Sequence, residues 1–480
     1  MKYFNLLTKA TADGRDLLQP VVDMAAYFDY SVGEGSACSL ELREQEKGWQ
    51  ALLTLEGTTY TGYCAYGNSA TGQVSRCVKV AAVEAFTKAT GLKPSLPWGV
   101  LTGVRPGKLA HKLIDQGLTF QELPNVLAKE YLLPNSQGQL LTKICQRQKE
   151  LLADKDRFQE AGLYIGIPFC PSRCSYCSFP AGIVPEDEES QENFLNLIEQ
   201  DLENVVQLLS MHSLKITSLY VGGGTPTSLS ERVFGRFMDG LAKVRLPYLQ
   251  EFTVEAGRPD CFSAGKLAAM EAAGVNRISV NPQTFNDSTL RAIGRSHTVA
   301  DFYQAYTMVR ESSIPVINMD LIIGLPGEDP HMIEGSLTKA LELDPENLTV
   351  HTLTLKRSTP LFGGSHSLDP AEAGALVAKA MELAQGAGLA PYYLYRQHYM
   401  LGHLANIGYA KAGTESLYNI QMMEERHPVF GVGPSSATKL PLRDGHHLAK
   451  LTMPKNVNIY GSRLQELFAK RAALLAPAGE

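Results

Sequence analysis

The chain has 480 residues, more than one hydrophobic core usually organises, so we expect two or three domains. Its 44% hydrophobic and 20% charged residues are typical of a globular protein and exclude a disordered or fibrous chain. A formal net charge of −6 gives no electrostatic footprint for nucleic acid, so no nucleic-acid partner is expected. No apolar run approaches the roughly 20 residues of a membrane span, and the N-terminus lacks an apolar signal core. We therefore expect a cytoplasmic protein.

The first part of the chain is predicted to be rich in β-structure. Alternating apolar and β-branched or aromatic residues predict strands over 37–42, 49–56 and 59–66, separated by glycines. A one-sided apolar pattern then predicts a helix over 73–90, and further helices are expected over 108–116, 120–131 and 139–152. These elements predict an α+β N-terminal domain over 1–98 and a helical connector over 99–160.

From residue 163 the pattern changes to strands that alternate with helices. Strands are predicted over 163–167, 216–221, 252–255, 277–280, 316–323 and 348–355, with helices over 191–210, 231–244, 263–273 and 330–343 between them. Alternation at this spacing indicates βαβ units and a parallel sheet. We predict an α/β fold with a partial (β/α)6 barrel over 161–360. A helix over 370–387 begins a C-terminal α+β extension over 361–480 that is expected to cover the substrate.

Three cysteines lie together directly after the first predicted barrel strand. Cys170, Cys174 and Cys177 form a C-x3-C-x2-C loop. Zinc would need further paired Cys or His ligands, and a redox dithiol would leave Cys170 unexplained. Thiolates on one tight loop can instead reach three corners of a four-iron cluster and leave the fourth iron open. The other five are dispersed and are expected to be small buried hydrophobic side chains: Cys38, Cys64, Cys77, Cys145 and Cys261.

The cysteine loop, with Tyr176 as an aromatic residue before the last cysteine, resembles the signature of the radical S-adenosylmethionine superfamily. In that superfamily the open iron of a [4Fe–4S] cluster chelates the methionine part of S-adenosylmethionine, and reductive cleavage makes a 5′-deoxyadenosyl radical. The resemblance therefore implies that Cys170, Cys174 and Cys177 hold the cluster. It also implies that both the cluster and S-adenosylmethionine are cofactors.

Further motifs follow the predicted barrel strands in the same order as in the family. The Gly-rich segment 222–226 resembles the methionine-amine site, because backbone without side chains can approach a ligand. An arginine can bind the methionine carboxylate with two hydrogen bonds, and a carboxylate can accept from the ribose hydroxyls. Each motif alone also fits a tight turn, a loop cap, an ion pair or a helix cap. The residues implied as cosubstrate contacts are Tyr164, Tyr176, Phe179, Gly223, Gly224, Thr225, Glu255, Gln283, Arg295 and Asp320.

Within the superfamily, the sequence resembles the oxygen-independent coproporphyrinogen III oxidase-like group, and there the HemZ-type coproporphyrinogen dehydrogenases. Segments 276–298, 101–109, 392–397, 408–420 and 431–436 carry this likeness. The implied reaction, part of anaerobic haem biosynthesis, turns two propionates of coproporphyrinogen III into vinyl groups and gives protoporphyrinogen IX. The implied partners are a tetrapyrrole and an electron donor such as flavodoxin or ferredoxin. Candidate propionate-binding cations, each also explicable as a solvated surface charge, are Arg105, Lys108, Arg357 and Arg396.

Two positions depart from the family pattern. Gly166 stands where family members usually have His, and Phe179 stands where the classical bacterial oxidase has a fourth cysteine. Three other functions therefore stay open. The first is a haem-binding chaperone of the same fold, although this chain has only Tyr418-Asn419 near the chaperone's H-N-x-x-Tyr-Trp element. The second is a radical enzyme that modifies another tetrapyrrole. The third, a simple electron carrier, would not need the cosubstrate motifs.

Overall fold

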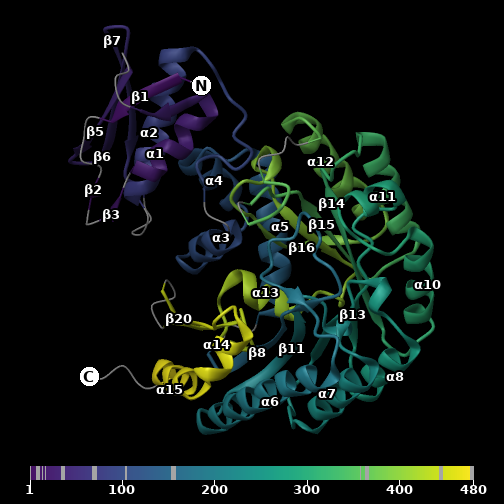
Figure 1. Ribbon diagram of the computed structural model, residues 1–480. Coiled ribbons are helices and arrows are strands. Elements are labelled where there is room, and N and C mark those ends of the chain that lie inside the picture. Colours follow the sequence, from purple (N-terminus) through teal and green to yellow (C-terminus); the bar gives the residue numbers. More distant parts are fainter. Residues whose placement is uncertain are drawn as a thin grey trace. The chain divides into compact units, whose positions relative to one another are not determined.

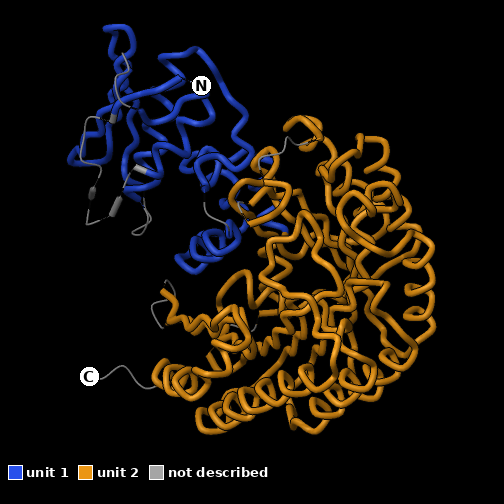
Figure 2. The backbone as a smooth tube through the Cα atoms, viewed as in Figure 1, with its two compact units in different colours: residues 1–143 blue, residues 144–480 orange. Residues whose placement is uncertain are grey.

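The computed structural model describes residues 2–6, 11–12, 15–16, 18–33, 38–67, 73–102, 105–152, 158–356, 358–362, 367–442 and 447–475. The chain divides into two compact units, residues 1–143 and 144–480 (Figure 2). The boundary falls inside helix α5 (Asn135–Leu151). The finer division into four domains at residues 98, 160 and 360 stays a prediction.

Unit 1 contains a five-stranded sheet with the strand order β4-β1-β5-β6-β7. Strands β5 (Cys38–Gln45), β6 (Gly48–Leu55) and β7 (Thr58–Ala65) form an antiparallel meander. They confirm the three predicted strands, except that residue 37 lies outside the described residues. Strands β1 (Lys2–Leu6) and β4 (Tyr30–Val32), which pair in parallel, were not predicted.

Helix α2 (Gln73–Thr90) has the predicted bounds and packs on β6 and β7. A Cβ atom at Gly62 of β7 would lie 1.9 Å from the carbonyl oxygen of Ala81, so glycine permits this close approach of helix and strand. On the helix, Phe86 packs against Phe4 and Phe28, with ring centroids 5.7 and 5.4 Å away. The remaining elements of unit 1 are α1 (Leu18–Ala25), α3 (Pro106–Asp115), α4 (Leu123–Tyr131), β2 (Thr11–Ala12) and β3 (Arg15–Asp16).

Unit 2 is built on a sheet of eleven strands, whose central part is parallel. Six neighbouring strands run in the same direction and confirm the predicted partial (β/α)6 barrel. In sheet order they are β15 (Asn347–Thr352), β14 (Val316–Ile323), β13 (Arg277–Ser279), β12 (Glu251–Glu255), β11 (Lys215–Gly223) and β8 (Glu160–Ile167).

The helices between these strands follow one another along the outer side of the sheet (Figure 1). Several begin at a side chain that caps the free backbone N–H groups of the first turn. Asp187 caps α6, and Thr298 with Asp301 forms a reciprocal capping box at α10. The helices are α6 (Glu188–Met211), α7 (Glu231–Lys243), α8 (Ala264–Ala272), α9 (Asp287–Ala292), α10 (Val299–Arg310) and α11 (Pro330–Glu342).

After α12 (Pro370–Gly386), C-terminal strands extend the sheet at both edges. β17 (Asn406–Ala410) pairs antiparallel with β15, and β16 (Ala390–Tyr395) pairs with β17. At the other edge β18 (Val429–Val432) pairs parallel with β8, followed by β19 (Ala437–Pro441) and β20 (Leu448–Thr452). The sequence did not predict these strands. The last helices are α13 (Leu417–Glu424), α14 (Val457–Ser462) and α15 (Leu464–Leu475).

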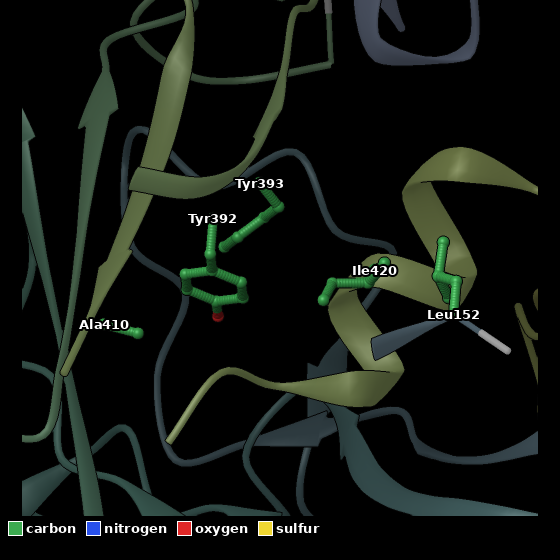
Figure 3. Packing of buried hydrophobic residues seen from close by; sticks show 5 residues of the cluster. All are labelled: Leu152, Tyr392, Tyr393, Ala410 and Ile420. Carbon is green, nitrogen blue, oxygen red and sulfur yellow. The ribbon is translucent and has the colours of Figure 1, made fainter. Parts of the chain in front are cut away.

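A hydrophobic cluster joins this extension to Leu152, the residue directly after α5 (Figure 3). Tyr392 and Tyr393 of β16 pack with Ala410 of β17, Ile420 of α13 and Leu152, and all five are buried. Removing this apolar surface from water holds α13 against the edge strand β16. None of the helices within the described ranges is long and apolar enough to cross a membrane.

Candidate cluster and cosubstrate site

The cysteine loop follows β8 at the carboxyl end of the barrel strands. Cys170 ends the short strand β9 (Phe169–Cys170), which pairs with β10 (Gly182–Ile183). The backbone N–H of Cys177 donates to the carbonyl oxygen of Cys174 (3.2 Å), and Ser175 N–H donates to the carbonyl oxygen of Ile293 (3.0 Å). The loop is therefore closed on itself and anchored to the segment that follows α9.

The three thiols are free, with Cys174 buried and the other two partly exposed. Burial raises the pKa of the Cys170 and Cys177 thiols. Among the described residues, no three Cys, His, Asp or Glu side chains converge as the ligands of a single metal ion would. A four-iron cluster does not require such convergence, because each thiolate binds a different iron. The donor set thus fits three ligands of a [4Fe–4S] cluster.

The Gly-rich loop after β11 packs directly against the entrance to the cysteine loop. Gly223 has a φ of +113°, and a Cβ atom at Gly224 would lie 2.3 Å from the carbonyl oxygen of Phe169. Thr225 N–H donates to that same oxygen (2.6 Å), and its Oγ1 lies 3.5 Å from Sγ of Cys170. The Gly-rich loop, residues Gly223, Gly224 and Thr225, therefore lies directly beside the cysteine loop, and backbone contacts join the predicted cosubstrate site to the predicted cluster site.

Glu255, the last residue of β12, is held by groups of the neighbouring strand. Its carboxylate accepts from Tyr220 Oη (2.5 Å) and from Gly223 N–H (3.3 Å). Tyr220 stacks on Tyr418 of α13 and on the predicted contact Tyr164, with centroids 4.4 and 6.2 Å away. Burial, with repulsion from the Asp320 carboxylate, raises the pKa of Glu255 to about 7.

Asp320 lies in the middle of β14, and its pKa is shifted in the opposite direction to that of Glu255. Asn318 Nδ2 donates to its Oδ1 (2.9 Å), and His351 Nε2 lies 3.6 Å from its Oδ2. Burial opposes ionisation, but the interactions with His351, together with hydrogen bonds from Asn318 and Thr349, outweigh it, and the pKa of Asp320 stays below its usual value. His351 is itself held by Tyr395 Oη, 3.3 Å from its Nδ1. The site thus contains two carboxyls whose environments shift their pKa values in opposite directions.

Gln283 and Arg295 carry buried polar atoms that the protein does not satisfy. Gln283 has a φ of +66°, a strained backbone conformation for a residue other than glycine. Its Oε1, together with Asn281 Oδ1 and Arg295 Nε, has no hydrogen-bond partner among the described residues. Arg295 Nη1 donates to the carbonyl oxygens of Gly257 (3.0 Å) and Asn281 (2.8 Å). Buried groups without partners at this edge fit a bound polar cosubstrate.

The remaining predicted contacts differ in their surroundings. Tyr176 packs on a hydrophobic cluster beside α9, and its Oη lies 3.4 Å from Arg295 Nη2. Phe179 is 56% exposed. At Gly166, a Cβ atom would lie 3.0 Å from the carbonyl oxygen of Pro434, because the turn after β18 passes over β8. The close passage of this C-terminal turn explains why glycine occupies that position.

Two of the four candidate propionate partners lie in unit 1 and one lies in unit 2. Arg105 precedes α3 of unit 1, Lys108 lies within that helix, and Arg357 lies outside the described residues. Arg396 is buried in unit 2, where Nη2 donates to the carbonyl oxygen of His403 (3.1 Å) and Nε to that of Leu404 (3.4 Å). Their roles in substrate binding stay predictions.

Sequence reasoning missed several residues at this edge. Arg258 donates to the sulfur of Cys174, Lys356 lies within electrostatic range of Cys177, and His351 contacts Asp320. Arg258 follows β12 by three residues, so its position after a barrel strand was a usable signal. His351 lies within β15, and its sequence context carries no motif that would have singled it out.

Comparison with known proteins was made over the whole chain. The profile of the Radical SAM superfamily matches residues 164–340. The oxygen-independent coproporphyrinogen-III oxidase-like protein HemZ of Bacillus subtilis is 37% identical over 399 residues, covering 82% of this chain and 79% of HemZ. The heme chaperone HemW of Bacillus subtilis is 35% identical over 278 residues, covering 56% of this chain and 69% of HemW.

Among solved structures, coproporphyrinogen III oxidase HemN from Escherichia coli has a similar fold. The TM-score is 0.51 at 19% identity, over 68% of this chain and 73% of HemN. Together these likenesses place the chain in the radical S-adenosylmethionine superfamily, whose cofactors are a [4Fe–4S] cluster and S-adenosylmethionine. Within that superfamily, it belongs to the HemZ-type, oxygen-independent coproporphyrinogen III oxidase-like proteins. Radical S-adenosylmethionine enzymes also need an electron donor and a substrate.

Proposed function

We propose that the chain catalyses the oxidative decarboxylation of two propionate side chains of coproporphyrinogen III, giving protoporphyrinogen IX. The observation that carries this proposal is the extent of the likeness to HemZ, which covers 82% of the chain. The barrel strands from β8 to β15 span residues 160–352 alone, so the likeness reaches well beyond the barrel. The likeness to the chaperone HemW covers 56% of the chain.

In this proposal Cys170, Cys174 and Cys177 hold the cluster at the carboxyl end of β8. When bound, the cluster and S-adenosylmethionine supply a 5′-deoxyadenosyl radical, which takes a hydrogen atom from the propionate β-carbon. The proposal is supported by the three free thiols on one anchored loop. It is also supported by the Gly-rich loop, whose backbone donates to the carbonyl oxygen of Phe169 and whose Thr225 hydroxyl lies beside Sγ of Cys170.

The neighbouring side chains bind and orient the cosubstrate. Asp320, ionised at neutral pH because its pKa is lowered, accepts from the ribose hydroxyls. Glu255 accepts from the methionine ammonium in its ionised form. Gln283 Oε1 and Arg295 Nε, which have no partner among the described residues, are free to bond to the cosubstrate. Holding the reacting groups in place away from water is the main contribution of the protein.

Each propionate loses one hydrogen atom from its β-carbon, and loss of carbon dioxide and one further electron leaves the vinyl group. The electron passes to an acceptor outside the chain. The propionate carboxylates need cationic partners, and the four predicted candidates remain Arg105, Lys108, Arg357 and Arg396. Lys356 joins them in this proposal, because it lies near Cys177 and is only partly buried. Burial lowers the pKa of its ammonium group, and a bound carboxylate would raise that pKa again.

The proposal is tested by anaerobic incubation of the reconstituted protein with coproporphyrinogen III, S-adenosylmethionine and a reductant. We expect 5′-deoxyadenosine together with a product that has lost two molecules of carbon dioxide, analysed by chromatography and mass spectrometry. The likeness to HemW makes haem carriage the second candidate. Stoichiometric haem binding without a decarboxylated product would contradict the proposal and favour that function. If 5′-deoxyadenosine forms only with a different tetrapyrrole, that tetrapyrrole would replace coproporphyrinogen III as the proposed substrate.

A further inference from the structure

Arg258 lies in the segment that follows β12, and its guanidinium lies against the cysteine loop. Its Nη1 is 3.5 Å from Sγ of Cys174 and 3.5 Å from the carbonyl oxygen of Ser172. Its Nη2 donates to Ser172 Oγ (3.0 Å), and that hydroxyl in turn donates to the carbonyl oxygen of Gly294 (3.3 Å). One side chain therefore contacts the sulfur of a predicted ligand and the backbone that presents it.

The arginine is held in this position by an ion pair. Arg258 Nε and Nη2 donate to the two carboxylate oxygens of Asp260, at 2.9 and 2.7 Å. Such a fork of two parallel hydrogen bonds fixes the plane of the guanidinium as well as its position. Arg258 is 3% exposed, so water neither screens its charge nor competes for its N–H groups.

Two further groups limit how this pair can move. His297 Nδ1 lies 3.8 Å from Asp260 Oδ1, and the ring is fully buried. Arg295 Nη1 donates to the carbonyl oxygen of Gly257 (3.0 Å), immediately before Arg258 in the chain. The segment that carries Arg258 is thereby joined to the predicted S-adenosylmethionine contact Arg295.

We propose that Arg258 is a positioning residue that donates an N–H···S hydrogen bond to Cys174 and raises the reduction potential of the cluster. This inference rests on the proposed ligand role of the three cysteines. Reduction adds one negative charge to the cluster, so a buried cation beside a ligand sulfur stabilises the reduced state more than the oxidised state. Hydrogen bonds to the sulfurs are among the factors that set such potentials.

The test measures the reduction potential of the reconstituted cluster by an anaerobic redox titration followed by electron paramagnetic resonance. In Arg258→Gln the cation is lost, and we expect the potential to become more negative. The expected effect is about a tenfold change in the reduction equilibrium, which is ~59 mV for a one-electron couple. Arg258→Lys keeps a positive charge but not the planar fork, so we expect a smaller shift in the same direction.

The matched control is Arg277→Gln. Arg277 is also a buried arginine of the same barrel, 5% exposed, with Nε 3.6 Å from Glu251. It begins β13 and so lies at the amino end of the strands, whereas the cysteine loop follows a carboxyl end. Its loss should lower the thermal stability of unit 2 and leave the cluster potential unchanged. A purely structural role for Arg258 would produce the same pattern as this control.

The proposal is overturned if the potential of Arg258→Gln equals that of the wild type while the cluster is fully loaded. If Arg258→Gln folds but does not retain the cluster, the Lys variant decides, and an unchanged potential there overturns the proposal. The measurement needs no tetrapyrrole, so it is independent of the proposed decarboxylation. A wild-type protein that binds no cluster would instead refute the cysteine assignment itself.

Discussion

Two places in the molecule bury cysteines beside arginines, and they differ in how their polar groups are satisfied. In unit 1, Cys64 of β7 and Cys77 of α2 hydrogen-bond to each other, and Sγ of Cys77 lies 3.3 Å from the carbonyl oxygen of Ala65. Arg76 donates to that oxygen (3.2 Å) and to the carbonyl oxygen of Glu130 (3.1 Å). At the barrel edge of unit 2, by contrast, buried polar atoms have no partner among the described residues.

The difference separates a structural arrangement from a binding site. Buried polar groups in folded proteins are almost always paired, and the groups around Cys64 and Cys77 follow this rule. The hydrogen bond from Cys77 lowers the pKa of the Cys64 thiol to about 7, so ready ionisation alone does not mark a metal ligand. What distinguishes the barrel edge is the combination of three cysteines on one loop with buried polar groups that have no partner among the described residues.

The largest expected effect is on the cluster itself. Cys174→Ser should abolish the visible absorption and the bound iron of the reconstituted protein, because it removes one of the three thiolate ligands. Cys77→Ser is the matched control, since Cys77 is also buried and lies in unit 1. It should retain the full iron content. Iron analysis and absorption spectra after anaerobic reconstitution measure both, and a cluster that survives in Cys174→Ser would refute the ligand assignment.

The next effect is on cosubstrate affinity. Asp320→Asn should weaken S-adenosylmethionine binding by about 10- to 100-fold, which corresponds to the loss of a charged hydrogen bond worth roughly 1.5–3 kcal/mol. Equilibrium dialysis on the cluster-loaded protein measures the affinity. Asp344→Asn serves as the control, because its side chain is 79% exposed. Equal affinities in the two variants would remove Asp320 from the site.

A smaller effect is expected from pH. Because the pKa of Glu255 is about 7, its ionised fraction falls up to tenfold for each pH unit below 7. S-adenosylmethionine affinity should therefore rise with pH through about 7 and level off above it. In Glu255→Gln the affinity should be weak and independent of pH over this window. A wild-type affinity that does not change between pH 6 and about 8 would contradict the assigned contact.

The same shift has a consequence for stability. The pKa of Glu255 is raised above its ordinary value of 4.5, so the folded state binds its proton more tightly than the unfolded state does. The stabilisation is complete below about pH 4.5 and is lost as the pH rises through about 7. Glu255→Gln should lack this loss. The stabilities of the wild type and of Glu255→Gln are compared by thermal unfolding over this pH range. The same pH dependence of stability in both proteins would contradict the raised pKa of Glu255.

The smallest expected effect is in unit 1. Cys64→Ser should lower the free energy of unfolding by about 1 kcal/mol, because it alters one buried hydrogen-bonded pair. It should leave iron content and S-adenosylmethionine affinity unchanged. Denaturant unfolding monitors the first quantity, and dialysis monitors the second. If Cys64→Ser loses the cluster, the distinction between the structural cysteines of unit 1 and the proposed ligand cysteines of unit 2 would be wrong.

The central fold was predictable because each βα unit carries its own local signal. A short apolar strand, a polar loop and an amphipathic helix recur, and a parallel sheet follows from that order. The cysteine spacing was likewise visible within eight residues, 170–177. The C-terminal strands were not predictable, because their pairing depends on partners far away in the sequence. β18 pairs with β8, more than 250 residues earlier, and β17 pairs with β15.

Site residues that lie within a sequence motif could be predicted. Site residues that come together only in the folded chain could not. Glu255 and Asp320 lie in recognisable segments, whereas Arg258 and His351 contact Cys174 and Asp320 only once the chain is folded. Gly166 was an unexplained departure in the sequence. In the structure it is the place where the C-terminal turn passes over β8, a cause that no local pattern records.

The most direct test of the account uses coproporphyrinogen III labelled with deuterium at the β-carbons of its propionates. The reconstituted protein is incubated anaerobically with this substrate, S-adenosylmethionine and reductant, and the 5′-deoxyadenosine is analysed by mass spectrometry. We expect deuterium to appear in 5′-deoxyadenosine as the vinyl product forms, because the proposed reaction needs a propionate β-carbon beside the radical carbon. Deoxyadenosine without deuterium, or its absence while haem binds tightly, would contradict it.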